Sequence, residues 1–265
     1  MNVISLIYHD VVDPGREATS GRQGEGPDRY KLTTDRFRDH LARLAAIGPD
    51  RRRLWSDTGG SEGSVLLTFD DGGASAAGII APLLEAQGWK GHFFIVSDLV
   101  GTPGFVTRDQ IRSLAAAGHG IGSHSASHPD RFASLTDGEQ REEWRRSLQA
   151  LGEILGRPVT VASVPGGYFD GRVAGNAAAC GVEALFTSEP RSRPWTVQGC
   201  RVFGRYSVTR STTAESVASL VGGSGAARTR QRMLWELKKA GKRVGGRWYT
   251  AARRNWMRGM DGKGR

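Results

Sequence analysis

The sequence predicts an α/β protein whose parallel strands form a distorted (β/α)7 barrel, followed by a basic helical tail. Short apolar segments alternate with amphipathic ones, which is typical of a parallel sheet whose strands are joined by helices. About seven such units occupy the first 220 residues, which favours a closed or nearly closed barrel over an open doubly wound sheet. Lys and Arg are concentrated after residue 227 and define the tail. The phosphate-binding patterns GxxxxGKS/T and strand-linked GxGxxG are absent, which argues against the common nucleotide-binding folds.

Each expected strand is a short apolar run. The first ends in YHD and the second, VLLTF, ends in DDGG. The expected strands span residues 3–8, 65–69, 92–96, 120–123, 159–163, 184–187 and 202–207.

The helices between the strands are expected from apolar spacing and from end residues. Apolar side chains recur at helical spacing after Thr34, which is expected to cap their helix. Thr136 and Glu139 have the spacing of a capping box at the start of another helix. Further helices are expected at 108–117 and 171–179, each closed by a nearby glycine.

Two segments have the composition of loops, residues 13–29 and 51–63. Segment 13–29 follows the first strand directly, so we expect it to lie over the catalytic face as a substrate loop. The chain is therefore expected to have two parts: a barrel over residues 1–220, and a linker with a basic tail over residues 221–265.

Composition predicts a cytoplasmic location. Hydrophobic residues make up 38% of the 265 residues and charged residues 24%, which is normal for a globular protein. No apolar run approaches the length of a bilayer span, and MNVISLIYHD lacks a basic leader. The two cysteines, Cys180 and Cys200, form no disulfide framework and suit a reducing compartment.

The positive charge is confined to the tail. The whole chain carries a formal charge of +10. Residues 228–265 contain 13 Lys and Arg against two acids, a net +11, so the remaining residues carry a net −1. Within 228–258, apolar side chains and three of the seven tryptophans recur at three- or four-residue steps between the cations.

This pattern predicts a basic amphipathic helix with two main alternatives. The helix contacts an anionic membrane at the inner face, or it packs along the barrel with its charges in water. Nucleic-acid binding is disfavoured because the body of the chain has no accompanying motif.

Asp70 and Asp71 follow the strand VLLTF. The pair is either a solvated turn or part of a site that needs two carboxylates with different roles. Barrel enzymes carry their catalytic groups at the C-terminal ends of the strands, so this position favours a functional site over a turn. His124 and His128 follow another strand at a spacing that lets both imidazoles bind one ion. With an aspartate they would form a metal set of two histidines and one carboxylate, although the spacing also occurs by chance on polar loops.

These residues lie in TFDDG (68–72) and SHSASHP (123–129), which resemble the first two motifs of the polysaccharide deacetylases. That family is the NodB-homology domain of carbohydrate esterase family four, and the resemblance extends from about residue 4 to about residue 213. It implies a distorted (β/α)7 barrel that binds a divalent metal, usually Zn²⁺, and removes acetyl groups from sugars. By position, Asp71, His124 and His128 would bind the metal. Asp70 would be the base that takes a proton from metal-bound water, whose pKa falls to roughly 7.

The third and fourth motifs of the family match less well. Where the family has Arg-x-Pro-Tyr, this chain has Ser163, Val164, Pro165 and Gly166. The missing arginine normally positions the catalytic aspartate. After Pro165, the Gly166 N–H is expected to donate to the oxyanion, unless PGG is only a turn. Residues 185–191, LFTSEPR, contain no match to the fourth motif.

His9 is the expected general acid. The family places a catalytic histidine on a late strand, and this chain has no histidine after His128. A barrel is cyclic, so a late strand can stand first in the chain. The poly-N-acetylglucosamine deacetylases resemble this arrangement and open on a YH dipeptide, so His9 would protonate the leaving amine. The alternative is a structural histidine at a strand end.

The remaining histidines and aromatic residues are expected to be structural. His40 is expected in solvent, and His92 and His119 at the strand ends remote from the site. Tyr30 and Trp195 could line a sugar cleft, although aromatic residues in barrels usually belong to the core.

Together these observations predict a metal-dependent hydrolase that deacetylates N-acetylated sugars, as a polysaccharide or a lipid-linked glycan precursor. Two alternatives stay open. The same scaffold could hydrolyse a cyclic amide, or the barrel could bind glycan without cleaving it.

Overall fold

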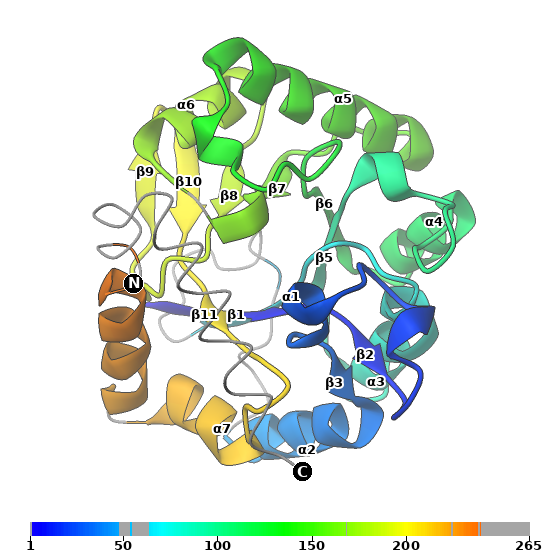
Figure 1. The fold of residues 1–265 in the computed structure, drawn as a ribbon, viewed down its shortest axis with the longest axis vertical. Helices are drawn as coiled ribbons and strands as arrows, with labels where there is room; N and C mark the ends of the chain where they lie inside the picture. Colours follow the sequence, from blue (N-terminus) through cyan, green and yellow to red (C-terminus); the bar gives the residue numbers. More distant parts are fainter. Residues whose placement is uncertain are drawn as a thin grey trace.

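In the computed structural model, which describes residues 2–47, 54, 64–167, 169–223, 225–237 and 239, the main sheet curls around itself and helices cover its outside (Figure 1). The described strands of this sheet follow the order β11-β1-β4-β5-β6-β7-β8-β10-β9. Their bounds are β1 Val3–Tyr8, β4 Ser64–Phe69, β5 His92–Ile95, β6 Gly120–Ser123, β7 Val161–Ser163, β8 Ala184–Phe186, β9 Trp195–Val197, β10 Cys200–Phe203 and β11 Tyr206–Ser207. Among these strands, β9 alone is antiparallel to its neighbour.

One short segment links strands near the two ends of the curled sheet. Strand β10 pairs with β8, and β11 pairs with β1, both in parallel. Only Gly204 and Arg205 separate β10 from β11, so residues 200–207 run from β10, the neighbour of edge strand β9, to β11 at the other edge of the sheet. The single strand expected over 202–207 is therefore two strands. At Gly204 a Cβ would lie 2.5 Å from the Glu189 carbonyl oxygen, so a side chain would not fit at this bend.

The strands are apolar because they are buried on both faces. Every residue of β1 and β4 is buried, as expected for parallel strands between a barrel interior and an outer layer of helices. Inside the barrel the Phe186 ring stacks on Phe203, with centroids 4.9 Å apart, and lies tilted against Phe94 at 5.2 Å. This aromatic layer fills the barrel beneath the catalytic edge.

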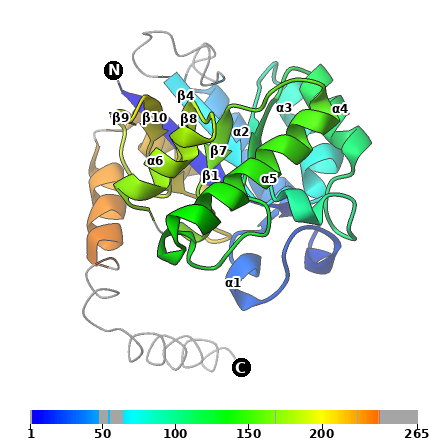
Figure 2. The same cartoon turned by 90° about the horizontal axis from the view of Figure 1, so that it is seen from above.

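The helices form the outer layer (Figures 1 and 2). The main ones are α2 Thr34–Ala45, α3 Ala81–Glu85, α4 Arg108–Ala116, α5 Asp137–Leu155, α6 Gly171–Ala179 and α7 Ala214–Gly222. The capping box expected at the start of α5 is confirmed, with Thr136 and Glu139 bonding to each other's backbone N–H. Helix α2 is capped by Thr33, not Thr34, because the Thr34 hydroxyl instead donates to Asp13 at 2.8 Å.

His40 is buried rather than solvated, which corrects the sequence expectation. It lies on the face of α2 that packs on the barrel. Its Nε2 lies 3.0 Å from the Thr212 carbonyl oxygen and its Nδ1 lies 3.4 Å from the Tyr8 hydroxyl. Burial is the main reason that its pKa is lowered. Charged neighbours along the helix suggested exposure, but the barrel wall offers this ring two polar partners.

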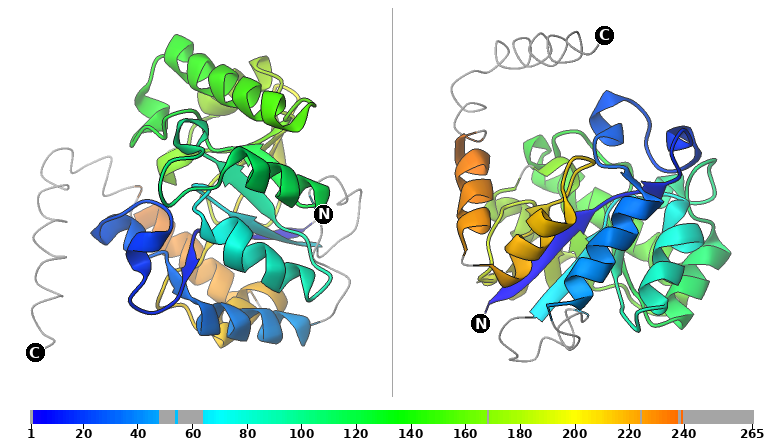
Figure 3. Two further views of the ribbon diagram at one scale, coloured as in Figure 1. Left: turned by 90° about the vertical axis from the view of Figure 1, so that its right-hand side faces the viewer. Right: turned by 90° about the horizontal axis from the view of Figure 1, so that it is seen from below.

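The segment after β1 carries β2 Val11–Val12, the short helix α1 Glu25–Asp28 and β3 Leu32–Thr33. Figure 3 shows α1 on the side of the molecule toward which β1 points. Residues 13–29 thus lie at the C-terminal edge of the strands, where the sequence placed a loop. The other expected loop, 51–63, falls outside the described residues except for Leu54.

A further helix follows the barrel over residues 226–237. Its Gln231 side chain bonds both backbone groups of Ser207, at 3.2 and 3.0 Å, which attaches it to β11. Helix α7 extends to Gly222, so it includes the first two residues of the expected linker. Within the part of the chain that the structure describes, no helix is long and apolar enough to cross a membrane.

Candidate metal centre and active site

The pairing of β1 with β4 brings His9 beside Asp70. The two strands are parallel, and Tyr8 lies opposite Phe69. The next residue of each strand is therefore at the same level, and the Asp70 N–H donates to the Tyr8 carbonyl at 3.0 Å. Two residues far apart in sequence thus meet at the C-terminal edge.

Asp71, His124 and His128 converge next to them. Asp71 Oδ1 lies 3.5 Å from Nε2 of both histidines. One ligand atom from each of the three residues falls within 4.8 Å of the others, which matches a set of two histidines and one carboxylate that leaves positions open on a metal. Asp71 and His128 have φ angles of 74° and 57°, which are uncommon for residues other than glycine.

The chemistry of these donors fits a divalent cation. Asp71 Oδ1 is buried and has no hydrogen-bond partner, a costly state that an ion would relieve. His124 Nδ1 lies 3.0 Å from the Ser163 carbonyl oxygen, so this nitrogen carries the proton and Nε2 keeps its lone pair toward Asp71. Burial is the main cause that lowers the pKa of His124 and of His128 to about 4. Both imidazoles are therefore neutral at physiological pH, as metal ligands must be.

Asp70 is held by an arginine that the motifs did not predict. Arg205 Nη1 donates to Asp70 Oδ1 at 2.7 Å, and Nη2 donates to Oδ2 at 2.9 Å. Burial alone would raise the pKa of Asp70. The Arg205 charge and its hydrogen bonds to the carboxylate outweigh burial and hold that pKa well below its usual range.

Ser163 is a hydrogen-bond partner of this arginine. Its hydroxyl accepts from Arg205 Nη2 at 2.6 Å and lies 3.3 Å from Asp70 Oδ1. Arg205 also donates to the Thr187 carbonyl and to the Thr68 hydroxyl, each at 3.0 Å. The guanidinium is 1% exposed and fully bonded. The positive charge expected at position 163 is thus supplied from the bend between β10 and β11.

One sequence pattern could have revealed Arg205. A charged residue lies inside the apolar stretch VFGRYSV, where an expected strand should carry buried side chains. A buried arginine needs a carboxylate partner, and the conspicuous unpaired carboxylates of the chain were Asp70 and Asp71.

The site opens into a cavity of about 670 Å³. His9 lies in its wall and stacks on Tyr30, with ring centroids 4.7 Å apart. The expectation that Tyr30 belongs to the core is therefore wrong, because the 13–29 segment carries it to the cavity. Arg22 of this segment also lines the cavity, and its Nη1 lies 3.1 Å from His128 Nε2.

Gly166 lies across the cavity from this segment. It has a φ of 68°, and a Cβ there would lie 2.7 Å from the Asp130 carbonyl oxygen, so only glycine fits. Pro165 is buried behind it. The PGG stretch is therefore a constrained turn that also borders the cavity.

The 226–237 helix completes the opposite wall. Trp235 lines the cavity, as does Lys239, which is also helical. The Lys239 ammonium lies 4.5 Å from the Trp235 ring centroid and 3.3 Å from Glu189 Oε1. Glu189 belongs to the LFTSEPR stretch that has no fourth motif. The aromatic side chain of Trp235, which belongs to the helix that follows the barrel, therefore borders the site near this stretch.

Three aromatic or histidine side chains do not reach the cavity. Trp195 packs against Phe169 and Arg191. His119 bonds Glu85 at 3.1 Å, and His92 stacks between strands at the far end of the barrel. The structural role expected for these two histidines agrees with their positions.

Comparisons with known proteins show that part of the chain is similar to polysaccharide deacetylases. Residues 57–185 match the family model described as polysaccharide deacetylase. YxkH of Bacillus subtilis, a polysaccharide deacetylase by name, is 28% identical over 137 residues, which are 52% of this chain and 49% of YxkH. The chain thus spans about half the length of that relative. A gellan lyase from a Bacillus species is 31% identical over 114 residues, or 43% of this chain and 4% of that protein.

Solved structures share the fold. A polysaccharide deacetylase of Bacillus cereus has a TM-score of 0.69 at 21% identity, over 83% of this chain and 69% of its own. IcaB of Ammonifex degensii has a TM-score of 0.67 at 22% identity, over 83% of this chain and 97% of its own. The Streptococcus pyogenes deacetylase PplD, solved in complex with acetate, has a TM-score of 0.67 at 19% identity, over 83% and 98%. These neighbours confirm the expected barrel, and over residues 57–185 the chain is similar to the polysaccharide deacetylase family.

Proposed function

We propose that the protein is a metal-dependent hydrolase that removes acetyl groups from N-acetylated sugars. The observation that carries the proposal is the convergence of Asp71, His124 and His128 beside an ionised, arginine-bound Asp70. Asp71, His124 and His128 would hold the ion, for which Zn²⁺ suits two imidazoles and a carboxylate. A divalent cation bound there would act as a Lewis acid for water and for the acetyl carbonyl.

Asp70 and His9 would each carry out one of the two proton transfers that the reaction needs. Asp70 takes a proton from the attacking water as its oxygen bonds to the acetyl carbon. The Gly166 N–H donates to the carbonyl oxygen as negative charge develops on it. His9 then gives a proton to the nitrogen as the C–N bond breaks. The products are acetate and the free amino sugar.

The test is metal content together with acetate release from N-acetylated oligosaccharides, with wild type beside Asp70→Asn. We expect about one zinc per chain in both proteins, and acetate release only from wild type. Bound metal without acetate from any sugar would contradict the proposal and favour hydrolysis of a cyclic amide or a glycan-binding role. Absence of metal binding would remove the metal centre itself.

We also propose that residues 228–258 contact an anionic membrane and that the enzyme works at its cytoplasmic face. The net charge of +11 in residues 228–265 supports this. Most of this segment lies outside the described residues, apart from 228–237 and Lys239.

A further inference from the structure

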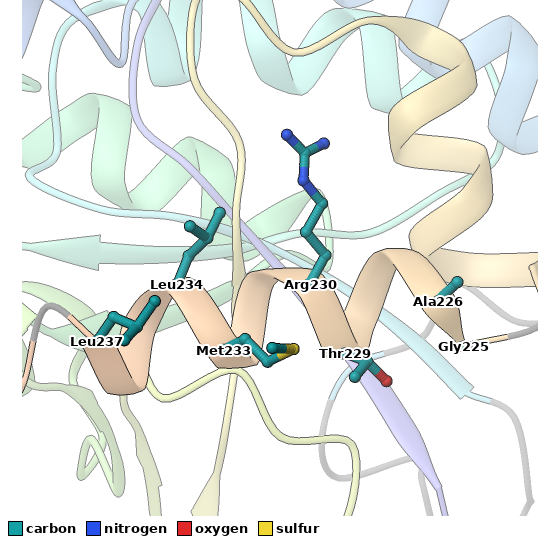
Figure 4. Close-up of a pocket in the computed structure, with 7 residues that line it drawn as sticks. All are labelled: Gly225, Ala226, Thr229, Arg230, Met233, Leu234 and Leu237. Atoms are coloured by element: carbon teal, nitrogen blue, oxygen red, sulfur yellow. The ribbon is translucent and has the colours of Figure 1, made fainter.

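The 226–237 helix has an exposed apolar face. Met233, Leu234 and Leu237 are 61%, 47% and 67% exposed, and they are the large hydrophobic side chains that stand exposed in the described part of the chain. Figure 4 shows all three on this one helix, together with Arg230, Thr229 and Ala226. An isolated exposed leucine needs no explanation, but three on one helical face form an interaction surface.

The opposite face of the same helix belongs to the barrel and the active site. Arg228 donates to the Leu220 carbonyl at 2.6 Å, and Gln231 bonds Ser207. Trp235 and Lys239, which is also helical, border the catalytic cavity. At 100° per residue, positions 228, 231, 235 and 239 fall on one side, and 230, 233, 234 and 237 fall on the other. One helix therefore forms a wall of the cavity and carries the exposed apolar face.

Charge identifies what can cover that face. Arg230 and Arg232 are exposed beside the apolar side chains, within a segment of net charge +11 on a body of net charge −1. A second copy would bring an equally basic segment against it, and like charges would oppose that association. An anionic bilayer complements both features, because it accepts apolar side chains below its headgroups and attracts cations at its surface.

We propose that Met233, Leu234 and Leu237 dock on an anionic lipid surface, and that the substrate is a membrane-anchored N-acetylated glycan. The second half rests on the proposed deacetylase function. Docking through this helix fixes the cavity wall formed by Trp235 next to the bilayer, so a sugar carried by a lipid enters the cavity without leaving the membrane. The helix then determines both where the enzyme acts and which acetylated sugars reach it.

The first experiment measures binding of the full chain to sedimented vesicles of phosphatidylglycerol and of phosphatidylcholine. Wild type is expected to bind the anionic vesicles, more weakly as salt rises, and not the zwitterionic ones. The variant Met233→Ser/Leu234→Ser/Leu237→Ser is expected to bind at least about tenfold more weakly, because the apolar contact is lost. Arg230→Gln should weaken binding more than Arg145→Gln, which removes the same charge from exposed α5.

Several outcomes would overturn the docking surface. Equal binding of the triple variant and wild type would exclude this face, and so would absence of vesicle binding at low salt. A wild-type dimer that becomes monomeric in the triple variant, without vesicle binding, would show that a second copy covers the face. Thermal unfolding of the variant must match wild type, so that misfolding does not mimic the loss.

The second experiment compares acetate release from an N-acetylglucosamine glycolipid in anionic vesicles with release from soluble oligosaccharide. The triple variant should lose about tenfold on the vesicle substrate and retain its rate on the soluble one. Equal rates of both proteins on vesicles would contradict the docking proposal alone. If wild type released no acetate from either substrate, the deacetylase function would be contradicted. The vesicle-binding measurement would still test the docking surface independently.

Discussion

Arg205 and Asp70 form a buried bidentate ion pair across the barrel, although 135 residues separate them in the sequence. Their partners are also internal: Ser163, Thr68 and Thr187 accept the remaining guanidinium protons. A guanidinium in this position holds the carboxylate ionised and fixes its orientation at the same time. The arginine that the third motif lacks is therefore replaced in space by one from the bend between β10 and β11.

Arg205→Met should destabilise the protein strongly. It leaves the Asp70 carboxylate buried without a partner, which typically costs about 3–5 kcal/mol of unfolding free energy. The double variant Asp70→Asn/Arg205→Met should recover part of that loss, because no buried charge is then left unpaired. Urea unfolding measures both. Arg146→Met is the control, since it breaks an exposed pair with Asp98 that should contribute less than about 1 kcal/mol.

Zinc affinity should depend on the histidines that line the cavity and not on buried histidines elsewhere. His124→Gln and His128→Gln are expected to lower zinc affinity by about tenfold or more, because each removes one ligand of three. His119→Gln should bind zinc like wild type, because His119 bonds Glu85 outside the cavity. Titration of metal-free protein with zinc, followed by calorimetry, gives the three affinities. Equal affinity across all three variants would refute the assignment.

His9→Ala should separate binding from turnover. His9 lies in the cavity wall but outside the convergent metal set. The variant is expected to keep its zinc while kcat falls about 100- to 10,000-fold, the usual contribution of a general acid. Tyr30→Phe, which keeps the ring stacked on His9, serves as the control. Turnover of His9→Ala close to wild type would show that another group protonates the amine.

Trp235→Ala should weaken substrate binding more than chemistry. Its ring borders the cavity and cannot transfer the protons that Asp70 and His9 carry, so KM for an N-acetylated oligosaccharide should rise about three- to tenfold with kcat little changed. Leu237→Ser changes the outer face of the same helix and should leave KM for soluble substrate unaltered. A fall in kcat with unchanged KM would contradict a binding role for the tryptophan.

Asp10 should make stability fall as pH rises. Its carboxylate is buried against Ser20 and Ser75, and burial raises its pKa above the unfolded value of about 3.9. The folded state therefore binds the proton more tightly, and the stabilisation from protonated Asp10 is lost as pH increases through the folded pKa. Asp10→Asn should abolish this contribution. The unfolding free energy of the variant should therefore rise relative to that of wild type as the pH goes from acid to neutral. Urea unfolding of metal-free protein from pH 5 to pH 8 checks the sign.

Local sequence determined the strands, most helix ends and the residues at each strand end. An apolar run such as VISLIY is buried wherever a parallel barrel forms, and a threonine three residues before a glutamate caps a helix through contacts within one turn. The consecutive parallel strands of a barrel carry their C-terminal ends at one edge, so the sequence predicts Asp70, Asp71 and His124 together there.

The tertiary structure alone decided the features that depend on distant pairing. The bend at Gly204 divides one expected strand into two, because residues 200–207 must pair with β8 and then with β1. That bend turns Arg205 into the barrel, and no local pattern relates it to Ser163. The burial of His40 and the position of Tyr30 in the cavity wall reverse their sequence expectations for the same reason. The side of a helix or loop that packs on the barrel depends on residues that are distant in the sequence. Folding brings those residues together, so their contacts exist only in the three-dimensional structure.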